Sequence, residues 1–189
     1  MGNRTQIVCL HEGHRGKSTD PVFINKLIRS LNPAWLRPHA GSNVIRLVGC
    51  GNRDAVMTTL PTQLKLCLQA GGDTTLMVWA DVDDDTTDGD QLRGRFWQEA
   101  QNAGISQDEF DQVVFVFAKD RIENWIEFLM VDCTDESREG PRVTDKTAAE
   151  AAKKLAKRCQ QQTMNPPLPP SLEWSCRNWR KLVERMKSP

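Results

Sequence analysis

Short apolar runs alternate with longer stretches of helical periodicity along most of this chain. Four runs have the length and residue content of strands, at residues 6–10, 43–48, 75–80 and 112–118. Each run is almost continuously apolar and does not alternate with polar residues. Because the strands of a parallel sheet are buried on both faces, this pattern favours a parallel sheet over a half-exposed antiparallel one.

Apolar residues at helical spacing occupy the segments between and after these runs. Asp20 followed by Pro21 is typical of a helix start, and the apolar stripe beyond it predicts a helix to about residue 31. Further helices are predicted near residues 54–70, 90–103, 121–131 and 147–161. With right-handed crossovers, the alternation predicts an α/β fold with a mostly parallel, four-stranded sheet and helices on both faces.

The last part of the chain has a different character. A proline-rich stretch, MNPPLPP, precedes a segment with the spacing of an amphipathic helix. We therefore divide the chain into an α/β domain at residues 1–162, a proline-rich spacer at 163–171 and a C-terminal helical tail at 172–189. Trp174 and Trp179 in the tail are candidate contacts for a partner protein. The other tryptophans within apolar patterns are predicted to be core, namely Trp79, Trp97 and Trp125.

Charge is divided unevenly along the chain, although the formal net charge is zero. Up to Pro141 there are 14 Lys and Arg against 21 Asp and Glu, a net of −7, and beyond it 11 against 4, a net of +7. The zero total provides no field that would attract nucleic acid to the whole molecule. The basic tail can either neutralise the acidic body or bind phosphates locally.

Cysteine usage and hydropathy indicate the compartment. Six cysteines are scattered without a CxxC pair, which disfavours a zinc site. No signal peptide precedes the first apolar run, and no run is long enough to span a bilayer. We therefore expect a cytoplasmic location, reduced thiols and no membrane partner.

Carboxylates follow the predicted strands at the points where the strands end. Glu12 follows the first run, Asp81 and Asp83 follow the third, and Glu123 comes soon after the fourth. Ligands of open α/β sheets collect beyond the carboxyl ends of the strands, so we expect these side chains to meet at one edge. Residues two apart in an extended segment point the same way, which lets Asp81 and Asp83 bind one cation while Val82 faces the core. The sequence therefore predicts a site for Mg²⁺ or Mn²⁺.

Other interpretations of these residues stay open or conflict with the chemistry. The acidic stretch at residues 81–90 can be a solvated loop with helix-capping aspartates. His11 and His14 are three apart, not four as in the HExxH motif of zinc proteases. The same acidic stretch has Leu92 where a calcium-binding EF-hand needs a glutamate.

Taken in order, the residues resemble the TOPRIM domain of topoisomerases, primases and overcoming-lysogenisation-defect (OLD) nucleases, most closely the OLD-like branch. The resemblance spans about residues 6–160. Its motifs follow successive strands and are Glu12 with Gly13, a glycine turn at residues 49–51, and Asp81 with Asp83. It extends to an Ile-Glu-Asn-aromatic segment at residues 122–125 and a lysine near the start of a later helix, Lys146.

The resemblance implies a two-metal nuclease that uses Mg²⁺ or Mn²⁺. The metal ligands that it implies are Glu12, Asp81 and Asp83 for one ion, and Glu123 with Asp20 or Asp85 for a second. The catalytic residues that it implies are Glu12, Asp81, Asp83, Glu123 and Lys146, with the lysine stabilising the charged transition state. Gly16 stands where the family has an aspartate four residues after the glutamate, so Asp20 is a candidate replacement.

Basic residues beside the predicted site are candidates to bind the phosphates of a nucleic acid, namely Arg15, Lys17 and Arg121. The alternative is that they are solvated, as most exposed arginines and lysines are. If they bind phosphates, the acidic body has a local basic rim despite its net negative charge.

The leading hypothesis is an Mg²⁺- or Mn²⁺-dependent endonuclease that cleaves DNA, as the TOPRIM subunit of an ATPase-containing complex in phage defence or DNA processing. The ATPase would be a separate protein docked partly through the C-terminal helix, because this chain has no Walker-type phosphate-binding loop. A topoisomerase is disfavoured because the chain contains no Tyr to serve as nucleophile. The alternatives are a noncatalytic TOPRIM-like interaction module and an RNA-processing endoribonuclease.

Overall fold

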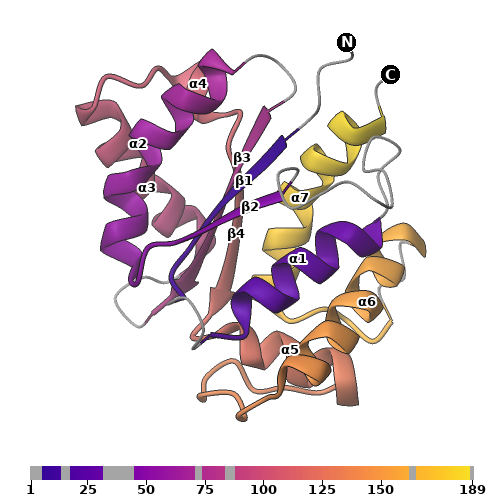
Figure 1. Cartoon of the computed structure of the whole chain (residues 1–189). Helices are drawn as coiled ribbons and strands as arrows, with labels where there is room; N and C mark the ends of the chain where they lie inside the picture. The colour runs from indigo at the N-terminus through magenta and orange to yellow at the C-terminus, as the bar shows by residue number, and fades with distance from the viewer. Residues whose placement is uncertain are drawn as a thin grey trace.

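The computed structural model describes residues 6–13, 18–31, 45–70, 74–83, 88–161 and 165–187. Within these ranges a four-stranded, all-parallel sheet has the order β2-β1-β3-β4 (Figure 1). Its strands are β1 (Gln6–His11), β2 (Ile45–Gly49), β3 (Thr74–Val82) and β4 (Val114–Lys119). The predicted parallel α/β sheet is confirmed, with strand bounds that differ from the predicted ones by at most a few residues.

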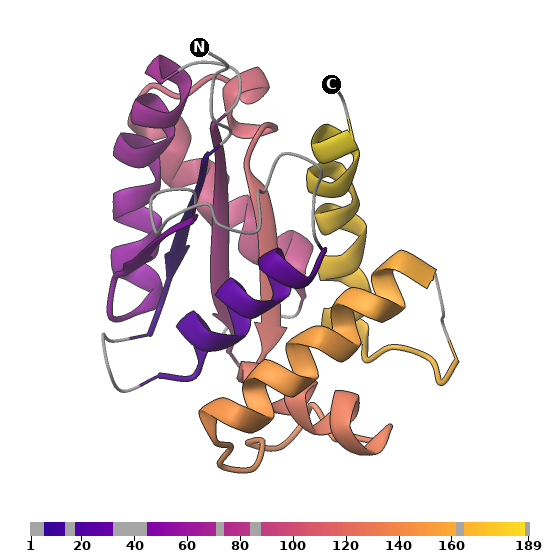
Figure 2. The ribbon, with the colours of Figure 1, turned by 45° about the vertical axis from the view of Figure 1, so that its right-hand side comes forward.

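Helices cover both faces of this sheet (Figures 1 and 2). The helices are α1 (Asp20–Leu31), α2 (Arg53–Gln69), α3 (Gly89–Asn102), α4 (Gln107–Phe110), α5 (Ile122–Val131), α6 (Asp145–Gln161) and α7 (Pro170–Lys187). One face is covered by α2 and α3, and the other by α1 with α6 packed on it, while α7 lies along the outer edge of β4 (Figure 2). The short helix α4 was not predicted; it begins with a capping box in which Ser106 and Glu109 satisfy each other's backbone amides.

Strand β3 shows why the apolar runs were continuous. Met77 and Trp79 belong to the core under α1 and α6, whereas Val78 and Ala80 belong to the core under α2 and α3. A strand between two cores needs apolar residues on both sides, as parallel sheets do. Val82 is buried in the α2 and α3 core, as predicted.

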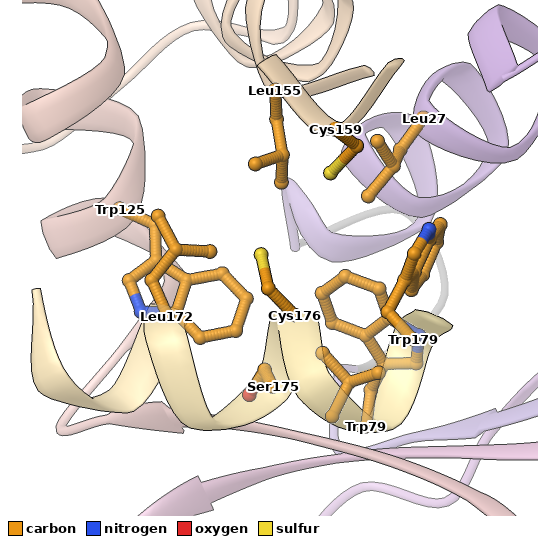
Figure 3. Close-up of a pocket in the computed structure, with 10 residues that line it drawn as sticks. Leu27, Trp79, Trp125, Leu155, Cys159, Leu172, Ser175, Cys176 and Trp179 are labelled. Atoms are coloured by element: carbon orange, nitrogen blue, oxygen red, sulfur yellow. The ribbon is translucent and has the colours of Figure 1, made fainter. Parts of the chain in front are cut away.

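The C-terminal helix packs on the chain's own sheet. Leu172 and Trp179 are buried in the core under α1 and α6, and Ser175 lies at β4 (Figure 3). The Ser175 hydroxyl accepts a hydrogen bond from the Phe117 amide at 2.9 Å and donates one to the Phe117 carbonyl at 3.0 Å. These bonds satisfy backbone groups on the outer edge of β4, which would otherwise be an unpaired sheet edge.

The expected partner contact is wrong for Trp179, whereas Trp174 packs on the chain's own sheet and stays partly exposed. Trp179 is buried, and the Trp174 ring stacks on Phe117 with centroids 5.1 Å apart. The Trp174 indole also donates a hydrogen bond to Asp90 at 3.0 Å. The apolar face of α7 is therefore part of the core. Trp79 and Trp125 are buried and Trp97 is partly buried, as predicted.

A small apolar space remains between α7 and its neighbours, beside the Cys159 and Cys176 side chains (Figure 3). Its volume is about 10 Å³, room for at most one water molecule. It is too small to bind a substrate. All six cysteines are free thiols, and no helix among the described residues is long and apolar enough to cross a membrane.

Candidate metal centre at the carboxyl ends of the strands

Acidic side chains meet at the carboxyl edge of the sheet, where α1 and α5 begin. A Glu12 carboxylate oxygen accepts a hydrogen bond from the Asp81 amide at 2.7 Å. Residues 69 apart in sequence are thus joined across the ends of β1 and β3. The predicted meeting of Glu12 with the acidic end of β3 is confirmed.

Asp81 lies at the centre of this cluster. It follows Trp79 on the same face of β3, so its side chain emerges on the side covered by α1. The pKa of its carboxyl is raised well above the usual value, first by burial and then by the charges of Glu12, Asp20, Asp83 and Glu123. The carboxylates that follow three different strands, together with Asp20, are therefore close enough to influence the ionisation of Asp81.

Two further carboxyls of the cluster also have shifted pKa values. Burial raises the pKa of Glu12 to about 7, even though the hydrogen bond from the Asp81 amide and the charge of Arg53 favour its ionised form. Burial likewise raises the pKa of Asp20, against hydrogen bonds that involve Ser18 and Gly13. Acids crowded in this way hold protons unless a cation compensates their charge.

The loop before α1 fixes Asp20 beside the cluster. Asp20 is the first residue of α1, as the Asp-Pro signal predicted. A Cβ on Gly13 would lie 2.8 Å from the Asp20 carboxylate and 2.5 Å from the Ser18 hydroxyl, so only glycine fits there. The neighbouring Thr19 hydroxyl donates a hydrogen bond to Glu123 at 3.0 Å, which ties this loop to α5.

Arg53 was not predicted from sequence. Its guanidinium forms an ion pair with Asp83 at 3.1 Å and donates to the Asp81 carbonyl at 3.4 Å. It therefore turns Asp83 towards the start of α2 while it also contacts the backbone of Asp81. The sequence signal that could have revealed Arg53 is its place directly after the glycine turn at the end of β2.

Asn124 explains why α5 starts where it does, a role that sequence reasoning also missed. Its buried side-chain amide donates to the carbonyls of Lys119 at 3.3 Å and Arg138 at 3.0 Å. A Cβ on Gly140 would lie 2.7 Å from the Asn124 backbone nitrogen, so the 138–140 segment passes very close to α5. Asn124 thereby holds the adjacent Glu123 at the end of β4.

His11 is the other residue that sequence reasoning did not assign to the site. It is only 2% exposed, and its Nδ1 lies 4.0 Å from the Asp20 carboxylate. That nitrogen has no hydrogen-bond partner among the described residues. Burial lowers the pKa of the imidazole, which favours its neutral form.

The remaining predicted site residues are exposed or lie outside the described ranges. Lys146 is exposed in the first turn of α6 and makes no ion pair with a described residue. Arg121 is exposed and forms an ion pair with Glu139. The predictions for Asp85, Arg15 and Lys17 fall outside the described residues.

The donor set fits a divalent cation: its carboxylates are typical ligands of Mg²⁺ and Mn²⁺, and it also contains one imidazole. Among the described residues, no three such side chains already stand at metal-binding spacing. The Glu12 oxygen that bonds to the Asp81 amide is one reason. Binding an ion here would therefore require these side chains to move closer to one another.

Comparison with protein-family models, with curated proteins and with solved structures finds no match to this chain. The resemblance to TOPRIM domains therefore stays a prediction from the sequence motifs.

Proposed function

We propose that this protein is an Mg²⁺- or Mn²⁺-dependent endonuclease of the TOPRIM type, nearest the OLD-like branch, that cleaves DNA. One observation supports this most directly: Glu12 meets Asp81 across the ends of β1 and β3, and the pKa of the partly buried Asp81 carboxyl is raised first by burial and then by the charges of Glu12, Asp20, Asp83 and Glu123. Such a group of carboxylates is costly in the metal-free protein. It becomes favourable when a divalent cation is bound.

The residues around the cluster have distinct roles in this proposal. A bound divalent ion supplies an activated water and neutralises the departing oxygen of a phosphodiester. Glu12 and Asp81 hold the ion from neighbouring strands, and Asp20 and Glu123 complete its surroundings from the starts of α1 and α5. Arg53 positions Asp83 through their ion pair. Lys146 remains the candidate to stabilise the charged transition state, and Arg15, Lys17 and Arg121 remain candidates to bind substrate phosphates.

The proposal includes a partner and a compartment. An ATPase subunit would be a separate protein, because the chain lacks a Walker-type loop. Since one face of α7 is buried in the core, such a subunit would have to bind another surface. The free thiols of all six cysteines fit a reducing compartment such as the cytoplasm.

A noncatalytic interaction module is the second candidate, and two observations favour it. Gly16 stands where TOPRIM domains have an aspartate, and one Glu12 carboxylate oxygen already accepts a hydrogen bond from the Asp81 amide. In this alternative the acidic edge binds a cation or a basic partner and cuts nothing.

The decisive experiment is a cleavage assay on plasmid DNA and on structured RNA, each with Mg²⁺, with Mn²⁺ and with a chelator. We expect metal-dependent cleavage that prefers DNA and falls at least about a hundredfold in Asp81→Asn and in Glu12→Gln. Asp108→Asn, which changes an exposed acid on α4, is the matched control and should cleave normally.

Each other outcome assigns a different function. Cleavage of RNA alone would identify a ribonuclease. No cleavage by a folded protein that still binds divalent ions would favour the noncatalytic module.

A further inference from the structure

The imidazole of His11 is enclosed at the end of β1. A Cβ on Gly49, its register partner in β2, would lie 3.3 Å from His11 Cε1 and 3.6 Å from Nε2. The ring therefore lies against the backbone of Gly49, and the residue is only 2% exposed. His11 and Trp79 lie on the same side of the sheet, which is also the side of Asp81.

The Nδ1 atom of this ring has no hydrogen-bond partner among the described residues. Its nearest charged group is the Asp20 carboxylate at 4.0 Å, too far for a hydrogen bond. A buried ring nitrogen without a partner is unfavourable and calls for an explanation. This nitrogen faces the Asp20 carboxylate, and a metal ion bound between the two groups would be such an explanation.

The separation of the two atoms suits a shared metal ion. Imidazole nitrogens and carboxylate oxygens bind first-row metals at roughly 2.0–2.2 Å, so two donors on one ion can be up to about 4.2 Å apart. The distance of 4.0 Å between His11 Nδ1 and Asp20 Oδ2 lies within this limit. Asp20 in turn belongs to the group of acids whose charges act on Asp81.

We propose that His11 Nδ1 and Asp20 Oδ2 are ligands of a divalent ion at this cluster, and that the nitrogen makes the site select Mn²⁺ over Mg²⁺. The inference rests on the metal site of the proposed function and adds its selectivity. Mg²⁺ is a hard ion that prefers oxygen ligands and keeps its waters. Mn²⁺ accepts an imidazole more readily, so one buried nitrogen donor shifts the preference towards it.

The test uses the full chain loaded with Mn²⁺ and measures binding directly. Pulsed electron paramagnetic resonance detects a nitrogen nucleus bound to Mn²⁺, and calorimetry gives the affinities for Mn²⁺ and Mg²⁺. We expect a nitrogen signal that disappears in His11→Gln. We also expect Mn²⁺ affinity to fall at least about tenfold in that variant, with a smaller change for Mg²⁺. His14→Gln is the matched control, since it removes the histidine nearest in sequence, and it should keep the signal.

The results separate this inference from the proposed function. Mn²⁺ binding without a nitrogen signal, or an unchanged Mn²⁺ to Mg²⁺ ratio in a folded His11→Gln variant, would overturn the inference even if DNA is cleaved. A signal that depends on His11 in a protein that cleaves nothing would uphold the inference and overturn the nuclease. If His11→Gln does not fold, His11→Asn replaces it in the test. Loss of the nitrogen signal in His11→Asn, with the signal retained in His14→Gln, would uphold the inference, and retention in His11→Asn would overturn it.

Discussion

Glu12 shows how a single buried carboxyl links metal binding to stability. Burial raises the pKa of its carboxyl from 4.5 to about 7, more than the Asp81 amide and Arg53 lower it. An acid whose pKa is higher in the folded state binds its proton more tightly there than in the unfolded chain. Its proton therefore stabilises the fold at pH values below about 4.5, and this stabilisation is lost as the pH rises through about 7.

We predict that the metal-free protein loses stability between pH 5 and pH 8, and that Glu12→Gln loses less. The difference between the two proteins should be about 1–3 kcal/mol, allowing for solvent screening of a partly exposed group. Urea unfolding in the presence of a chelator, at several pH values, measures it. An identical pH dependence in both proteins would show that the ionised Glu12 carboxylate is not penalised in the fold.

At the scale of elements, helix α3 contains two glycines in opposite situations. A Cβ on Gly89 would lie 2.5 Å from the Trp174 ring, which itself stacks on Phe117. A Cβ on Gly94 would have nothing within 4 Å, and that residue is exposed. Gly89 is therefore required for the close approach of α7, whereas Gly94 only lowers the helix propensity of α3.

Alanine at these two positions should have effects of opposite sign. Gly89→Ala is expected to displace the Trp174 ring and to lower the free energy of unfolding by about 1–3 kcal/mol. Gly94→Ala, its control in the same helix, should raise it by about 0.5–1 kcal/mol. Urea denaturation followed by tryptophan fluorescence measures both. Equal effects of the two substitutions would mean that α7 does not pack on the start of α3.

At the scale of the whole molecule, α7 contributes to both cores and covers the outer edge of β4. Leu172 and Trp179 fill the core under α1 and α6, and Ser175 bonds to the outer edge of β4. Trp79 contacts both Trp125 and Trp179 edge to face, with centroids 6.0 and 6.2 Å apart. The helix joins the sheet to the layer of helices on that face and is a structural part of the domain.

A chain that ends at residue 164 should therefore fail to unfold cooperatively and should aggregate, because it exposes the β4 edge and an apolar surface. Circular dichroism on heating and size-exclusion chromatography would detect both effects. The full-length variant Arg177→Ala, which changes an exposed side chain of α7, is the control and should behave as the parent does. A truncated chain with an unchanged melting temperature would restore the interpretation of α7 as a free docking arm.

Local patterns in the sequence were sufficient to predict most helices and strands and the contact between Glu12 and the end of β3. The continuous apolar runs predicted a parallel sheet, because strands buried between two helical layers cannot alternate with polar residues. Glu12 and Asp81 were predicted to meet because parallel strands bring their carboxyl ends to a common edge. These inferences need only the order of residues and the periodicity of strand and helix.

Contacts between distant segments were decided only by the tertiary structure. Arg53 turns towards Asp83, and His11 faces Asp20, through packing that no local spacing encodes. The apolar stripe of α7 could equally have bound another protein, because an amphipathic pattern predicts that one face is buried but does not predict which surface covers it. In the structure α7 packs on its own chain. It buries apolar area of the core and pairs backbone groups at the edge of β4, and both contributions favour the folded state.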